Sequence, residues 1–183
     1  SFVFSILSDV TVPVIDGIAS FDDLPVFEGT FLTSNFTFNS RTPNQKFILP
    51  NSGIDTELIA VSVKGNEQST TSTKYTTQDS LLDVKSNSKV YFLQEIENER
   101  YELFFGDGIF GEKLEEGNFI TVNYITCNGD SANGINQFQF SGKLTYIRNS
   151  IEYTVTSGIS LLTTSVSAQG GEVIESVDSI KKF

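Results

Sequence analysis

Hydrophobic and polar residues alternate along most of this chain, so that apolar side chains recur at every second position. Ile59, Val61 and Val63 follow this pattern, which in an extended strand places all three side chains on one face. Val, Ile, Thr, Phe and Tyr dominate such runs, and these side chains pack well on a pleated sheet. The same alternation occurs in RYELFF (100–105), in FITVNYI (119–125), and at the pairs Phe36/Phe38 and Phe138/Phe140.

Polar turns separate the alternating runs. Many short strands joined by such turns predict a mainly β fold, an antiparallel β-sandwich-like arrangement. We expect it to span residues 1–169, as one structural domain or as two packed β subdomains. The N-terminal SFVFSIL should form a strand, and a short edge strand should lie near Tyr75, after a long polar loop. The turns are PNSG (50–53), KGN (64–66), EGN (116–118), NGD (128–130) and NG (133–134).

The hydrophobic period changes only at the C-terminal end. Val173, Val177 and Ile180 recur at helical spacing after Gly170-Gly171. Acidic residues precede lysines in this segment, as the helix dipole favours. The sequence therefore predicts a short helix over residues 170–183, the start of a segment leading into a further C-terminal domain. Its stripe of Val173, Val177 and Ile180 is a candidate interface.

The net charge of −11 narrows the range of partners. Nucleic acids and anionic membranes bind proteins through lysine and arginine, so both are poor partners for this chain. No apolar run is long enough to insert into a membrane. The segment from Glu95 to Glu116 contains eight acidic residues and only two basic residues. This region is either a solvated edge that resists strand aggregation or a docking surface for a basic partner.

The residues needed for common catalytic chemistry are missing. The chain has no histidine and a single cysteine, which excludes Ser-His-Asp and Cys-His arrangements, the usual zinc sites and an internal disulfide. Cys127 reads as a small hydrophobic residue at a strand end. The acids show no calcium-loop spacing and no distinct pair of general acid and base. We expect no catalytic residue, no metal and no cofactor, and therefore no enzyme.

One motif argues for a different function. Gly106 to Gly111 reads G-D-G-I-F-G directly after a plausible strand, a spacing shared with dinucleotide-binding loops. Such loops open a helix whose amides hold the phosphates, but here a turn at Gly117-Asn118 and another strand follow within a few residues. We therefore expect a structural β element, shaped by Gly106, Asp107, Gly108, Gly111, Gly117 and Asn118.

The same stretch resembles a known family, the baseplate wedge protein of T-even-type contractile-tailed bacteriophages, related to the baseplate J proteins. The resemblance rests on an ordered set of elements: YELFFGDGIFG (101–111), Gly117-Asn118, the strand 119–125, Asn128-Gly129 and Asn133-Gly134. Gly170, Gly171, Glu175, Ser176 and Ile180 match a further family segment, G-G-x-x-x-E-S-x-x-x-I.

The resemblance implies a structural role in the virion tail baseplate, with assembly in the host cytoplasm. It implies a homo-oligomer, a dimer in the full-length protein, that packs with other wedge proteins around the hub and rearranges on sheath contraction. The alternative function is a β-sandwich binding or adhesin domain that recognises a surface carbohydrate or protein. Such a binder would need exposed aromatic residues around a concave site.

Overall fold

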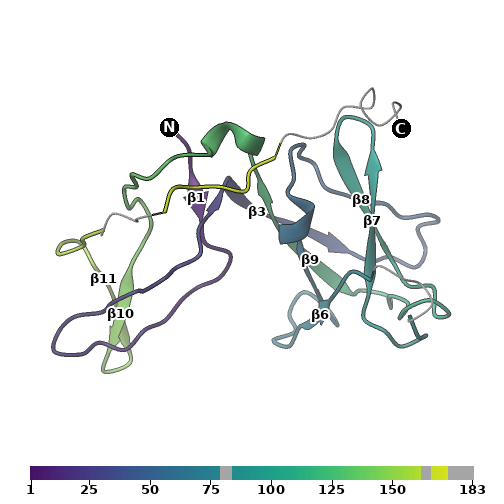
Figure 1. Ribbon diagram of the computed structural model, residues 1–183. Coiled ribbons are helices and arrows are strands. Elements are labelled where there is room, and N and C mark those ends of the chain that lie inside the picture. The colour runs from purple at the N-terminus through teal and green to yellow at the C-terminus, as the bar shows by residue number, and fades with distance from the viewer. Residues whose placement is uncertain (79–83, 162–165, 173–183) are drawn as a thin grey trace. The chain divides into compact units, whose positions relative to one another are not determined.

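The computed structural model describes residues 1–78, 84–161 and 166–172 (Figure 1). The fold over these residues is mainly β, with antiparallel sheets, as the alternating sequence predicts. The chain divides into two compact units, Ser1–Asn128 and Gly129–Phe183. The predicted boundary after residue 169 stays a prediction.

The first unit contains a four-stranded antiparallel sheet with the strand order β3-β9-β5-β6. β9 is one of its two interior strands and pairs with β3 over eight residues, from Thr30↔Thr126 to Thr37↔Phe119. The predicted edge strand near Tyr75 is confirmed as β6. The strands are β3 (Thr30–Thr37), β5 (Ala60–Lys64), β6 (Thr73–Tyr75) and β9 (Phe119–Thr126).

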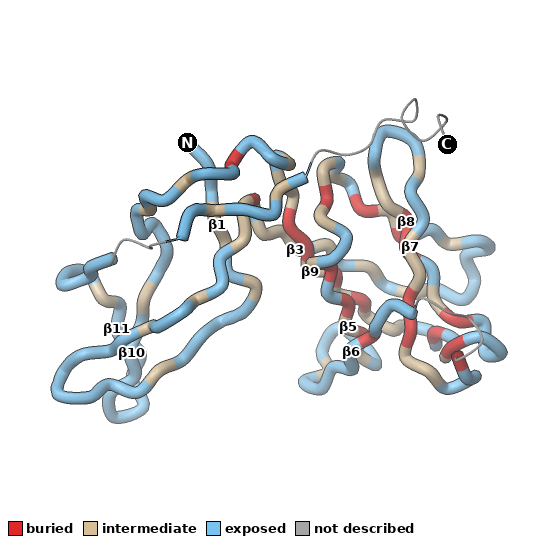
Figure 2. The backbone as a smooth tube through the Cα atoms, viewed as in Figure 1, coloured by how far each residue is buried: buried red, intermediate tan, exposed pale blue. Residues whose placement is uncertain are grey.

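A second antiparallel sheet has the order β4-β8-β7, with β4 (Phe47–Ile48), β7 (Tyr91–Ile96) and β8 (Arg100–Phe105). The two sheets share one hydrophobic core, to which β9 contributes Ile120, Val122 and Tyr124 from alternate positions. Phe47 packs edge-on against Phe36 and Phe105, with ring centroids 5.6 and 5.5 Å apart, a geometry that aromatic pairs favour. Figure 2 shows the buried positions along these strands.

The N-terminal region forms less regular structure than its sequence predicts. Of SFVFSIL, only β1 (Phe4–Ser5) is a strand, and it pairs with β2 (Phe27–Glu28). Between them lies an extended loop in which Ile15 and Ile18 form an isolated bridge across a turn. Apolar residues alone do not make a strand, because the backbone groups also need a partner strand. Most residues from 6 to 26 are exposed (Figure 2).

The second unit contains a 3-10 helix, η3 (Gly129–Ala132), and a hairpin of β10 (Thr145–Arg148) and β11 (Ile151–Thr154). The prediction of a strand at Phe138 and Phe140 is wrong, because residues 135–140 form no regular secondary structure. Their alternation is real, but alternation alone does not fix regular strand geometry, and the backbone bonds of this segment to Ala168, through Gly134 and Ile135, do not extend into a strand. The predicted C-terminal helix lies, from residue 173 onward, outside the described residues. Within those residues the only helices are short 3-10 turns, so the structure gives the helix no support.

Candidate functional site

The glycine loop connects β8 to β9 and closes on itself. Gly106 forms a parallel bridge with Lys113, and the Gly108 N–H donates to the Gly111 carbonyl oxygen at 3.0 Å. The loop is also tied to the segment before β7, because the Gly111 N–H donates to Lys85 O and the Glu112 N–H to Ser88 O, at 3.1 and 2.8 Å. It is therefore a fixed part of the β structure.

Asp107 organises the tip of this loop. Its Oδ1 atom accepts hydrogen bonds from the N–H groups of Ile109 and Phe110, both at 2.8 Å. The bonds from Phe110 and Ile109 lower the pKa of the Asp107 carboxyl below its ordinary value, because they stabilise the charged form. Together with the backbone bonds described above, these two bonds mean that the N–H groups of residues 108 to 112 all donate within the protein. A phosphate could be held by them only after these bonds were broken.

The three loop glycines meet different local requirements. A Cβ atom on Gly106 would lie 2.1 Å from the Gly111 carbonyl carbon, so the backbones approach too closely for any side chain. Gly111 has φ +88°, and an added Cβ atom would collide with the Val90 side chain, whereas a Cβ on Gly108, at φ +93°, would meet only the Lys113 side chain, at 3.9 Å. Positive φ values favour glycine. Sterics and backbone conformation account for these glycines without any ligand.

The loop exposes two large apolar side chains, Ile109 and Phe110, with exposed fractions of 70% and 50%. Beside it, Lys89 forms an ion pair with Glu112. The Tyr75 hydroxyl lies 3.5 Å from Glu112 Oε1, and burial, together with this carboxylate, raises the pKa of Tyr75 to about 12. Tyr75 therefore stays protonated at neutral pH and can donate to Glu112.

The Gly117-Asn118 turn joins the loop region to the four-stranded sheet. Gly117 has φ +83°, and its N–H donates to Phe38 O, while the Phe38 N–H donates to Asn118 O. The Asn118 side chain accepts from the Glu115 N–H at 2.9 Å and donates to Gly65 O at 3.4 Å. This turn thereby connects the ends of β3 and β5 to the start of β9.

The eight acids between Glu95 and Glu116 do not form one patch. Glu95, Glu97 and Glu99 lie at the β7–β8 hairpin turn, whereas Asp107 lies at the opposite end of β8, about 20 Å away for a six-residue strand. Glu102 is buried, with 4% exposed, and pairs with Lys46 at 3.1 Å. Glu116 accepts from the Ser40 N–H at 2.6 Å. A single docking surface made of all eight is therefore not present.

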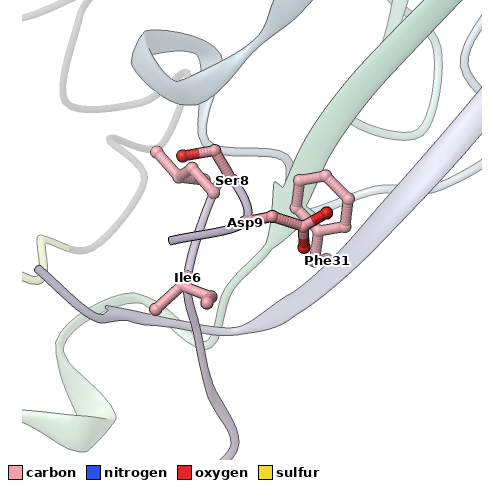
Figure 3. A pocket seen from close by; sticks show the side chains of 5 residues that line it. Ile6, Ser8, Asp9 and Phe31 are labelled. Atoms are coloured by element: carbon pink, nitrogen blue, oxygen red, sulfur yellow. The ribbon is translucent and has the colours of Figure 1, made fainter. Parts of the chain in front are cut away.

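Two hollows open on the first unit. One, of about 300 Å³, is lined by residues 6 to 9 and Phe31, and Figure 3 shows the Phe31 ring beside Asp9. The other, of about 410 Å³, lies next to the Lys46–Glu102 pair. Over residues 1–78, 84–161 and 166–172, no three potential ligands cluster around a metal position. No helix in that part of the chain is long and apolar enough to cross a membrane.

The sequence did not reveal one exposed hairpin, and the interface stripe that it predicted cannot be placed. Val173, Val177 and Ile180, the candidate interface stripe, lie outside the described residues. The hairpin β10–β11 was not predicted, although Asn149-Ser150 stands between two alternating runs, TYIR and IEYT. Cys127, directly after β9, is half-buried, and its N–H donates to Gly53 O.

Comparison with known families gives a match over the central part of the chain. The family described as "Bacteriophage baseplate wedge protein gp6, third domain" matches residues 32–135, more than half of the 183 residues. This range contains the shared core, the glycine loop and the Gly117-Asn118 turn. No curated protein matches the chain at a significant level.

Proposed function

Because this chain belongs to the family of the third domain of bacteriophage baseplate wedge protein gp6, we propose that it is a structural module of a phage tail baseplate wedge. It self-associates, packs with other wedge proteins around the central hub, and rearranges when the sheath contracts. It assembles in the host cytoplasm and resides in the virion. It acts through protein contacts and not through catalysis, in keeping with the structural role of that family.

The distribution of apolar side chains supports this proposal. Every buried hydrophobic residue of the described chain lies between Phe47 and Ala132, inside the matched range. Large exposed hydrophobic residues show the opposite distribution over the described residues: eight lie before residue 32, three within 32–135, and eight after 135. The matched domain thus has its own core, and the flanking segments leave apolar surface in water. Such surface is typical of segments that bind other proteins.

Hairpin β10–β11 is the clearest example. All eight of its residues are exposed, including Ile147 at 77%, and Tyr146 stacks on Tyr153 with centroids 5.1 Å apart. An isolated two-stranded hairpin is at best marginally stable in water. A partner that covered its apolar residues would stabilise it.

Reconstitution tests the proposal. The tagged chain is mixed with the other purified baseplate wedge proteins of the same phage, and complexes are measured by size-exclusion chromatography with light scattering. We expect co-elution, which Ile18→Asp and Ile147→Asp should weaken at least tenfold, because each would place a charge in an apolar contact. The matched control is Ile109→Asp, which alters a residue of similar exposure inside the matched range.

Absence of any complex between the unaltered chain and the wedge proteins would overturn the proposal. Equal weakening by all three substitutions would remove the role assigned to the flanking segments. Saturable binding of a surface oligosaccharide, without wedge binding, would favour the alternative adhesin function.

A further inference from the structure

Strand β3 forms one edge of the four-stranded sheet. It pairs with β9 on one side, and in the described part of the chain no strand pairs with its other side. At eight residues it matches β9 as the longest of the described strands. A long open edge offers a row of backbone donors and acceptors to any added strand.

The register shows which residues direct their backbone groups outward. On β9, Cys127 N–H donates to Gly53 O and Ile125 O accepts from Asp55 N–H, so the odd-numbered positions of β9 face away from β3. The even positions of β9 therefore bond the even positions of β3, their partners in the register. In an antiparallel ladder the alternate residues then point their N–H and C=O groups to the other side. For β3 these residues are Phe31, Thr33, Asn35 and Thr37.

The two ends of this edge are partly occupied. Phe31 borders residues 6 to 9 in the hollow of Figure 3, and Thr37 O accepts from Gln45 Nε2 at 2.8 Å. The middle of the edge remains open. Thr33 and Asn35 are both exposed, and their side chains bond to β9 on the outer face of the sheet, Thr33 to Asn123 and Asn35 to Thr121.

The charge pattern identifies the occupant. β3, TFLTSNFT, contains no charged residue and no proline, although edge strands of monomeric proteins commonly carry one or the other to block pairing. When two copies pair through the same edge, each residue near the two-fold axis comes close to the same residue of the other copy, so a charge there would be repelled by its copy. In a chain with net charge −11, the long uncharged edge of β3 lets two copies pair without bringing like charges together.

We propose that β3 pairs antiparallel with β3 of a second copy, joining the two sheets into one continuous sheet. Thr33 of one copy then lies opposite Asn35 of the other, with Ser34 on the two-fold axis. This pairing rests on the proposed self-association and specifies the surface through which it occurs. The contact is short, so we expect a weak, reversible dimer.

A charge-exchange experiment tests it. Sedimentation velocity is recorded for the chain over a range of concentrations, and then for Thr33→Lys/Asn35→Lys and Thr33→Glu/Asn35→Glu. Each double variant alone should dimerise at least tenfold more weakly, because like charges would face each other. An equimolar mixture of the two should restore or strengthen the dimer, because opposite charges then meet.

The matched control is Thr71→Lys/Thr73→Lys, which adds the same charge to exposed positions in and beside β6, at the opposite edge of the same sheet. It should dimerise like the unaltered chain, and far-ultraviolet circular dichroism should show that all variants keep the β fold. A third variant of β3, Thr33→Pro, removes an N–H that points away from β9, so no bond to β9 is lost. It should also weaken the dimer.

Three results would overturn the proposal. A monomeric chain at all concentrations would exclude self-pairing, while wedge binding in the reconstitution above would still support the baseplate function. A dimer unchanged by the β3 variants would place self-association elsewhere. Loss of wedge-protein binding in β3 variants of a monomeric chain would identify a different protein, and not a second copy, as the occupant of this edge.

Discussion

Asn133 and Gly171 lie 38 residues apart in the sequence and exchange two hydrogen bonds. Asn133 Nδ2 donates to Gly171 O at 2.9 Å, and Gly171 N–H donates to Asn133 Oδ1 at 3.1 Å. Gly134 N–H and Ala168 O form a further bond at 2.8 Å in the same region. The Asn-Gly segment and the Gly-Gly segment, two separate motifs of the sequence, thus meet within the second unit.

Replacement of Asn133 by Asp should loosen this contact. The substitution removes the donor to Gly171 O and places a carboxylate oxygen against that carbonyl, so the segment should lose about 1 kcal/mol of local stability. Hydrogen exchange at the Gly171 amide measures it, and exchange should become several-fold faster. Asn136→Asp, an exposed change in the same loop, is the control and should leave this rate unchanged. Equal rates in all three proteins would contradict the prediction.

Two glycine-to-alanine substitutions should differ widely in cost. Gly106→Ala puts a methyl group against the backbone of Gly111, and we expect a loss of about 3 kcal/mol or more. Gly117→Ala meets no atom within 4 Å and carries only the cost of φ +83°, about 1 kcal/mol. Urea unfolding followed by tyrosine circular dichroism compares them. Similar losses at both positions would show that the close approach of the loop backbones is not maintained in solution.

The Asp107 carboxyl should titrate below its ordinary pKa of 3.8, chiefly because of the Phe110 and Ile109 amides. Since the folded pKa lies below the unfolded one, the stabilisation is present above the unfolded pKa and is lost as pH falls through the folded pKa. Nuclear magnetic resonance titration of the carboxyl carbon measures this shift. Asp107→Asn keeps the Oδ1 acceptor but removes the charge, and should abolish the acid-dependent loosening of the loop amides. Persistence of that loosening in the Asn variant would assign it to another group.

Ser150→Gly should stabilise hairpin β10–β11. Asn149 and Ser150 form its two-residue turn with φ values of 53° and 62°, a conformation that favours glycine at the second position. Relief of the left-handed strain at Ser150 should contribute about 1 kcal/mol. Amide protection across the Arg148–Ile151 pair reports the effect. Asn149→Gly is the matched control and should gain less stability, because asparagine tolerates this conformation better than serine does. A larger gain from Asn149→Gly would contradict the assignment of the strain to Ser150.

The sequence by itself determined much of the local structure. Period-two runs correctly placed β5, β8 and β9, because alternation of side chains between two faces is a property of each strand alone. Turn residues placed the Gly117-Asn118 and Asn128-Gly129 segments for a similar reason, since positive φ is a local requirement. The lack of histidine excludes histidine-dependent catalysis whatever the fold, because no arrangement of the chain can supply a missing side chain.

Tertiary structure decided which alternating runs became strands and which surfaces remained open. Phe138 and Phe140 alternate as well as Phe36 and Phe38 do, yet residues 135–140 form no regular strand, whereas Phe36 lies in β3 and pairs with Ile120 of β9. The pairing of β3 with β9 joins Thr33 to Asn123, 90 residues away, and no local pattern specifies such a partner. Of the acids that lie close in sequence between Glu95 and Glu116, those before β8 and those after it are separated by the length of that strand. Pairing and burial depend on contacts between distant segments, and these exist only in the folded chain.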